Sequence, residues 1–120
     1  MNKKTKSEWL QALKSDKYTQ GRGQLRGNNV DGIVCHCCLG VLADVMGEEI
    51  SENGLRLATD KEGFTMYDER FIKVPQDTIS TLYGINDDSH RNGERKYESV
   101  INIIENIVTD WDKNKRIKRN

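Results

Sequence analysis

Apolar residues recur every three or four positions near each end of the chain, and both stretches predict amphipathic helices. Near the start, Trp9, Leu10 and Leu13 form one apolar stripe, and residues 5–8 (Thr-Lys-Ser-Glu) have the spacing of a capping box that begins a helix. The second stretch predicts a long C-terminal helix of about four turns that is buried along most of its length. Its apolar positions are Tyr97, Val100, Ile101, Ile104, Ile107, Val108 and Trp111.

Residues 33–42 form the most apolar segment of the chain and contain all of its cysteines. The segment begins with β-branched residues and continues with apolar residues at helical spacing. This pattern predicts a short strand and then a helix over about residues 38–46, which ends at Gly47 in a left-handed cap. Gly40 inside this helix costs about 1 kcal/mol relative to alanine, so we expect another element to approach closely there.

Short strand-like runs predict the β-structure of the protein. Residues 24–26 and 33–35 predict a hairpin whose turn lies near Asn28-Asn29. Three further runs with partial alternation of apolar and polar residues predict a small antiparallel meander. These runs are residues 54–58, 63–67 and 70–74.

Pro75, the only proline, predicts the first turn of another helix, which Gly84 would end before a polar loop over residues 85–93. Together the elements predict an α+β fold. It is a single compact domain over residues 1–112, in which a small antiparallel sheet packs against about four helices, the last of them long. Residues 113–120 predict a basic, disordered tail.

Composition narrows the classes of function. Hydrophobic residues make up 35% of the chain, charged residues 32%, and the formal net charge is zero, which argues against a whole-molecule field that attracts nucleic acid or anionic lipid. No apolar run approaches the roughly 18 residues of a membrane span. Three cysteines so close together cannot link distant parts of the chain by disulfides, which favours a reducing cytoplasm.

The cysteines permit three interpretations. Cys35 and Cys38 form a C-x-x-C pair at a predicted strand-to-helix junction, a setting in which a thiolate is stabilised and thiol redox chemistry occurs. The same pair could bind zinc, with the ligand set completed by His36, His90 or a carboxylate. The pattern favours a third interpretation, in which Cys37 and Cys38 are small buried core residues. No second C-x-x-C is present, and helix rather than strand follows Pro75. We therefore expect neither a metal nor a cofactor.

A glycine-rich segment over residues 18–32 carries basic and aromatic side chains. It is not a nucleotide-binding glycine loop, because such a loop follows a strand and directly precedes a helix. Guanidinium groups can nevertheless bind a phosphate through paired hydrogen bonds while an aromatic ring stacks on a base. The candidate ligand-binding residues are Lys17, Tyr18, Gln20, Arg22 and Arg26. Solvated surface is the alternative for this set.

Two separated segments resemble a widespread group of small, mostly uncharacterised proteins from tailed bacteriophages and prophages. Cys35 is not part of that group's pattern. The resemblance implies a viral protein of the bacterial cytoplasm, and several unrelated accessory phage proteins bind nucleotide messengers of host defences. The segments are Trp9-x-x-Ala12-Leu13-x-Ser15-x-Lys17-Tyr18-x-Gln20-Gly21-x-Gly23-x-Leu25-Arg26 and Cys37-Cys38-Leu39-Gly40-Val41-Leu42.

The leading functional hypothesis is a non-catalytic phage protein that sequesters an anionic, nucleotide-type immune signalling molecule. We expect a homo-oligomer whose interface forms part of the pocket, without membrane or nucleic-acid binding. The alternative is a protein that inhibits a host enzyme by docking on it. A third hypothesis is thiol or zinc chemistry at Cys35 and Cys38.

Overall fold

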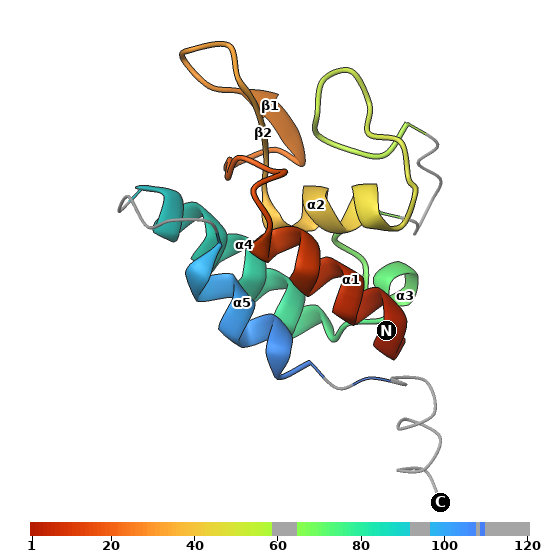
Figure 1. Cartoon of the computed structure of the whole chain (residues 1–120). Coiled ribbons are helices and arrows are strands. Elements are labelled where there is room, and N and C mark those ends of the chain that lie inside the picture. Colours follow the sequence, from red (N-terminus) through yellow and green to blue (C-terminus); the bar gives the residue numbers. More distant parts are fainter. Residues whose placement is uncertain (59–64, 92–96, 108, 110–120) are drawn as a thin grey trace, which may run out of the picture.

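The computed structural model describes residues 1–58, 65–91, 97–107 and 109, with only the backbone described for residues 88–91. These residues form a compact α+β domain in which a two-stranded sheet projects from a body of helices (Figure 1). In chain order the described elements are α1 (Lys3–Lys14), β1 (Arg26–Asn28), β2 (Val34–His36), α2 (Cys38–Val45), α3 (Glu69–Ile72), α4 (Gln76–Arg91) and α5 (Glu98–Glu105).

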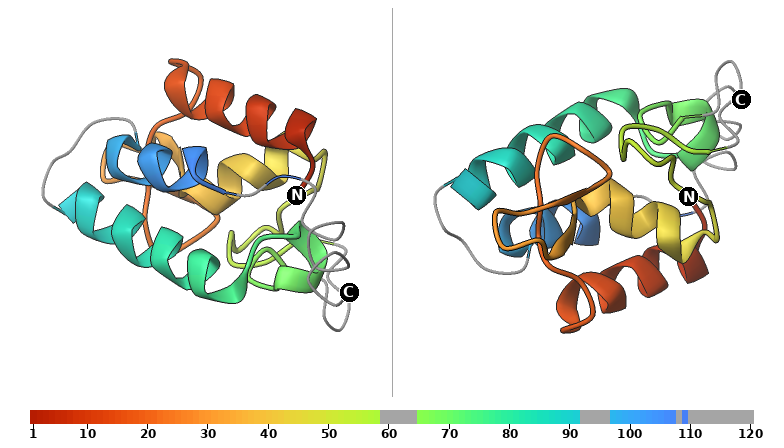
Figure 2. Two further views of the ribbon diagram at one scale, coloured as in Figure 1. Left: turned by 90° about the horizontal axis from the view of Figure 1, so that it is seen from below. Right: turned by 90° about the horizontal axis from the view of Figure 1, so that it is seen from above.

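Helix α2 forms the centre of the core, because nearly its whole length is buried. Figure 2 shows α2 and α5 lying between α1 and α4. Helix α2 contacts α1 and α4, and α5 contacts the same two helices from the other side. Trp9 of α1 is fully buried and its Nε1 donates to the Cys38 carbonyl at 2.9 Å. The predicted helix and its end are confirmed, since Gly47 follows α2 with a φ of 77°.

Helix α1 is confirmed by its buried Trp9 and Leu13, but it begins earlier than predicted. Asn2 is the N-terminal cap, and its Oδ1 accepts a hydrogen bond from the Thr5 amide at 2.7 Å. Residues 5–8 therefore lie inside the helix, and the predicted capping box is wrong. Asn2, three residues before Thr5, satisfies an orphan amide at an earlier start, so the helix gains about one turn.

The predicted hairpin is confirmed with strands shifted by one or two residues. Strands β1 and β2 are antiparallel, and Gly27 pairs with Cys35 at the centre of the register. The close approach expected at Gly40 is also confirmed, since a Cβ there would lie 1.8 Å from the Leu25 carbonyl oxygen. Glycine at this position lets the base of the hairpin rest directly on α2.

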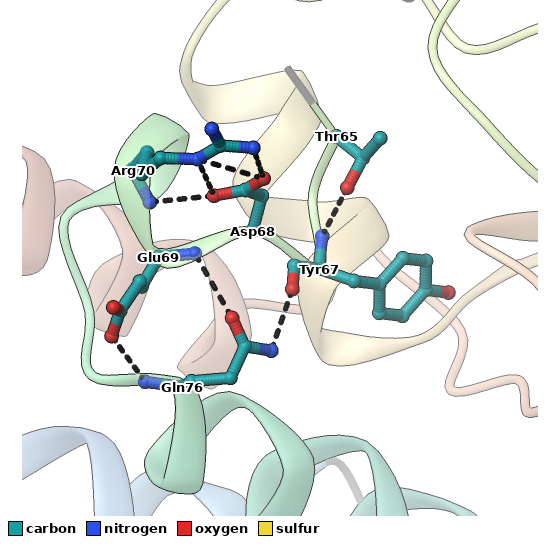
Figure 3. A network of polar contacts seen from close by, with 6 residues as sticks. All are labelled: Thr65, Tyr67, Asp68, Glu69, Arg70 and Gln76. Atoms are coloured by element: carbon teal, nitrogen blue, oxygen red, sulfur yellow. Dashed lines mark hydrogen bonds and ion pairs between the residues drawn. The ribbon is translucent and has the colours of Figure 1, made fainter. Parts of the chain in front are cut away.

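The predicted meander is wrong. Residues 70–74 belong largely to α3, and the run over residues 54–58 makes only an isolated bridge between Ile50 and Leu57. Residues 63 and 64 lie outside the described part of the chain. Helix α3 forms because Asp68 caps it, accepting from the Arg70 amide at 2.8 Å and from the Arg70 guanidinium (Figure 3).

A reciprocal polar pair joins α3 to α4 (Figure 3). The Gln76 amide donates to Glu69 Oε2 at 2.9 Å, and the Glu69 amide donates to Gln76 Oε1 at 3.3 Å. Gln76 Nε2 also donates to the Tyr67 carbonyl at 2.8 Å. These capping contacts satisfy backbone groups at both helix starts, which is why local polar chemistry outweighs the weak strand pattern.

Helix α4 begins after Pro75 as predicted, and the Ile79 amide donates to the Pro75 carbonyl at 3.0 Å. The predicted end at Gly84 and the loop after it are wrong, because the helix continues to Arg91. Buried Ile79, Leu82 and Asn86 continue one helical stripe across Gly84. A Cβ at Gly84 would meet nothing within 4 Å, so this glycine lies on the exposed face, where it lowers helix stability without ending the helix.

Helix α5 carries the predicted apolar stripe, with Val100 and Ile104 fully buried. It spans eight residues, shorter than the four turns predicted. The predicted end at Trp111 and the tail over residues 113–120 lie outside the described residues. Within the part of the chain that the structure describes, no helix is long and apolar enough to cross a membrane.

Candidate functional site

Lys17 and Tyr18, two of the predicted binding residues, lie against α2. The Tyr18 hydroxyl donates to the Asp44 carboxylate, and Lys17 Nζ lies 3.8 Å from the same carboxylate. The Tyr18 ring is buried and meets the His36 ring edge-on, with centroids 5.1 Å apart. Burial first, and then the hydrogen bond to Asp44, raise the pKa of Tyr18, so the phenol stays neutral. This ring is already engaged within the chain.

Gln20 and Asn86 form a buried polar network with three parts of the chain. Gln20 Nε2 donates to Asn86 Oδ1 at 3.3 Å, and Gln20 Oε1 accepts from the Tyr97 amide at 2.8 Å. Asn86 Nδ2 donates to the Gly21 carbonyl at 2.8 Å, and its Oδ1 accepts from the Cys38 amide at 3.2 Å. Asn86 of α4 thus holds the glycine-rich segment and the start of α2, and Gln20 holds the residue that precedes α5.

Sequence reasoning missed Asn86, because residues 85–93 were predicted to form a polar loop. The usable signal was its spacing from Ile79 and Leu82, which places it on the buried stripe of α4. A fully buried asparagine must satisfy its amide, and here each amide atom has a partner. Asn86 therefore helps to hold the glycine-rich segment that carries the candidate site.

Arg26 joins the hairpin to the loop over residues 50–58. Its Nη2 lies 3.3 Å from both the Ile50 and the Ser51 carbonyl oxygens. The Gly54 carbonyl accepts from the Leu25 amide at 2.7 Å, so backbone contacts join the same two segments. The Arg26 guanidinium consequently has a structural role, whatever else it binds.

Arg22, one of the five predicted residues, lines a pocket beside the hairpin, which we call the hairpin pocket. Its volume is about 140 Å³. Half of the other lining residues are asparagine or glutamine, and no carboxylate is among the lining residues. Among the described residues, no hydrogen bond or ion pair engages the side chain of Arg22 or Asn28. The lining residues are Gly21, Arg22, Gln24, Gly27, Asn28, Asn29 and Cys35.

Two glycines give the hairpin pocket its shape. A Cβ at Gly27 would lie 2.3 Å from Gln24 Oε1, and one at Gly21 would lie 2.8 Å from the Cys35 Cβ. The Gly23 amide is held by Asp87 Oδ1 at 3.2 Å, which fixes the loop that carries Arg22. The pocket therefore offers a guanidinium and side-chain amides in a fixed frame, a donor set that suits an anionic oxygen group.

The cysteines are free thiols, and all three are buried. The prediction that Cys37 and Cys38 are core residues is confirmed, since both belong to the hydrophobic core. Burial raises the pKa of Cys37 to about 11 and also raises that of Cys38. Thiolate is the reactive form, so both thiols are inert near neutral pH. Cys35 faces the hairpin pocket, whereas the Cys38 sulfur lies 3.9 Å from the Leu82 carbonyl.

His36 has a structural position at the end of β2. Burial lowers its pKa, Arg26 and Lys17 add to this effect, and Asp44 opposes it. In the described part of the chain, no group of three or more histidine, cysteine or acidic side chains is placed to hold a metal ion. The side chain of His90, another candidate ligand, lies outside the described residues.

Comparison with known proteins identifies one family that the chain matches. No curated protein and no solved structure matches the chain. Residues 1–117 match a family described as a domain of unknown function, DUF8296. Because this match covers nearly the whole chain, the protein belongs to the DUF8296 family.

Proposed function

We propose that this protein is a small phage accessory protein that counters a host defence by sequestering an anionic, nucleotide-type signalling molecule. It acts in the bacterial cytoplasm and performs no catalysis. The phage setting comes from the resemblance of residues 9–26 and 37–42. The hairpin pocket supports the binding role, because it combines asparagine and glutamine side chains with the Arg22 guanidinium, which has no partner among the described residues.

The size of the hairpin pocket limits what enters it. Pockets for drug-sized ligands begin at roughly 300 Å³, well above the 140 Å³ found here. One phosphoryl group therefore enters, and the rest of the nucleotide stays outside the pocket. Arg22 contacts the phosphoryl oxygens. Tyr18 and Gln20 act indirectly, because their hydrogen bonds hold the backbone just before the segment that carries Arg22.

Titration calorimetry of the purified protein against cyclic nucleotides and ADP-ribose derivatives tests this function. At least one ligand should bind, and Arg22→Ala should weaken that binding by tenfold or more, about the effect of removing a charged hydrogen-bond donor. Arg56→Ala is the matched control. It removes another exposed guanidinium, from the loop over residues 50–58, that does not line the pocket.

Two results would refute the proposal. One is the absence of heat with every ligand. The other is binding that Arg22→Ala leaves intact, or weakens no more than Arg56→Ala does. Mass spectrometry of the undenatured protein adds an independent check, because a retained nucleotide appears as a mass increment that Arg22→Ala should abolish.

A further inference from the structure

Tyr83 of α4 and Tyr67, just before α3, form an aromatic pair outside the hairpin pocket, which we call the tyrosine platform. Their rings meet edge-on, with centroids 5.7 Å apart and planes at 83°. Tyr83 is 42% exposed, so much of its ring is open to solvent, whereas Tyr67 is partly buried beside it. An exposed ring that a second ring holds in place is a surface on which a planar ligand can stack.

The Tyr67 ring is held in place by hydrogen bonds on both sides of its backbone. Its amide donates to Thr65 Oγ1 at 3.2 Å, and its carbonyl accepts from Gln76 Nε2 at 2.8 Å. Figure 3 shows the ring pointing away from these capping contacts. Burial raises the pKa of Tyr67, and the neighbouring Cys37 and Asp87 raise it further, so the phenol stays neutral. This ring is therefore a fixed and uncharged support.

Asp87 connects the tyrosine platform to the segment that carries Arg22. It follows Tyr83 by four residues in α4, so the Cβ atoms of these two residues are about 5–6 Å apart. Its Oδ1 accepts from the Gly23 amide at 3.2 Å, and Gly23 directly follows Arg22. The right-hand view of Figure 2 shows the bend of the glycine-rich segment lying over α4. The platform and the hairpin pocket are therefore adjacent, and one nucleotide can contact both.

The Asp87 carboxylate suits a base that carries an amino group. Its Oδ1 is shared by the Gly23 amide at 3.2 Å and Asn86 Nδ2 at 3.3 Å, whereas no group among the described residues donates to its Oδ2. A carboxylate oxygen accepts hydrogen bonds and cannot donate one. Oδ2 therefore favours an amino hydrogen over a carbonyl oxygen, and it repels a phosphate. These charges orient a nucleotide with its phosphate at Arg22 and its base at Asp87.

We propose that the tyrosine platform stacks on the purine base of the nucleotide whose phosphoryl group binds at Arg22. Asp87 selects a base that carries an amino group. This inference rests on the proposed function and gives the part of the ligand outside the hairpin pocket a place to bind. Adenine and guanine carry an exocyclic amino group and a large ring to stack, whereas uracil has neither. The ligand is therefore a purine nucleotide.

Titration calorimetry of the full chain with adenosine 5′-monophosphate (AMP), uridine 5′-monophosphate (UMP) and ribose 5-phosphate tests the platform. AMP should bind about tenfold or more tightly than ribose 5-phosphate, and more tightly than UMP. Tyr83→Ala should weaken AMP binding by about tenfold or more and leave ribose 5-phosphate binding unchanged, because it removes only the stacking surface. Tyr83→Phe is the matched control. It keeps the ring and should leave the AMP affinity unchanged.

Asp87→Asn tests the selection of the base. The asparagine keeps an oxygen that accepts from the Gly23 amide, and it replaces Oδ2 with an amide that donates. The preference for AMP over UMP should therefore shrink or reverse. An unchanged preference would overturn the role of Asp87.

The platform and the anion site can fail separately. Ribose 5-phosphate that binds through Arg22 as tightly as AMP does would overturn the platform and leave the anion site standing, as would equal AMP affinities of Tyr83→Ala and Tyr83→Phe. AMP binding that needs Tyr83 but not Arg22 would overturn the anion site alone. No binding of AMP would overturn both. Thermal unfolding guards against misfolding, because Tyr83 is exposed and its replacement should change stability little.

Discussion

Replacing Asn86 with alanine should destabilise the whole protein, because this side chain joins α4 to the glycine-rich segment and to α2. The change removes a hydrogen-bond partner from three buried groups: the Gly21 carbonyl, the Cys38 amide and the Gln20 side-chain amide. Of these, the Gln20 amide keeps a second acceptor, the Asn86 backbone carbonyl at 3.3 Å. Each lost hydrogen bond costs about 1 kcal/mol, and more where water cannot replace the partner. The free energy of unfolding should therefore fall by about 3–5 kcal/mol.

This loss is a large fraction of the roughly 5–15 kcal/mol that stabilises a domain of ordinary size. It corresponds to a melting temperature lower by roughly 12–20 °C. Urea denaturation followed by tryptophan fluorescence measures it directly, since Trp9 is buried against α2. Asn102→Ala is the matched control, because Asn102 lies on the exposed face of α5. It should change stability by less than about 0.5 kcal/mol.

The reasoning is refuted if the two asparagine variants have the same stability. That result would mean that water or a small backbone shift satisfies the three groups at no cost. A fall in stability with an unchanged denaturant dependence would support a local loss of hydrogen bonds. A changed dependence would instead indicate an altered native or denatured state.

Three further predictions concern the core. Gly40→Ala should lower the free energy of unfolding, measured by urea denaturation, by more than about 2 kcal/mol, because the new Cβ would lie 1.8 Å from a backbone oxygen at the hairpin base. Gly84→Ala should raise it by up to about 1 kcal/mol, because a Cβ there would meet nothing within 4 Å. The raised pKa of Cys37 predicts that its contribution to stability is full below pH 9 and is lost as pH rises towards 11. Urea midpoints under reducing conditions should therefore fall in that window, and less so for Cys37→Ser; equal pH dependence of the two proteins would contradict this. Tyr18→Phe should lower stability by about 1 kcal/mol by removing the hydrogen bond to Asp44, and an unchanged melting curve would show that this bond contributes nothing.

Among the candidate site residues, sequence reasoning identified the chemistry of Arg22 but not the orientation of its neighbours. A guanidinium next to glycines is visible in the sequence, and Arg22 does line the hairpin pocket. Tyr18 and Gln20 carry equally suitable groups, yet both turn inward, to Asp44 and to the Asn86 network. Their orientation depends on partners far away in the chain, which no local pattern reports.

Periodicity in the sequence by itself determined the stripes of α1, α2 and α5, because burial of apolar side chains dominates the free energy of folding and leaves a regular spacing. Two strand-like runs on either side of Asn28-Asn29 indicated the hairpin, although not its exact strand bounds. Only the tertiary structure decided which element forms where the local sequence signals were weak. Helix α4 continues through Gly84 because burying Leu82 and satisfying Asn86 outweighs the roughly 1 kcal/mol that one glycine costs. The run at residues 70–74 became part of α3 because Asp68 and Gln76 cap the two helix starts. At Gly84 contacts between distant residues were worth more than the propensity of one glycine, and at residues 70–74 capping contacts outweighed a weak strand pattern.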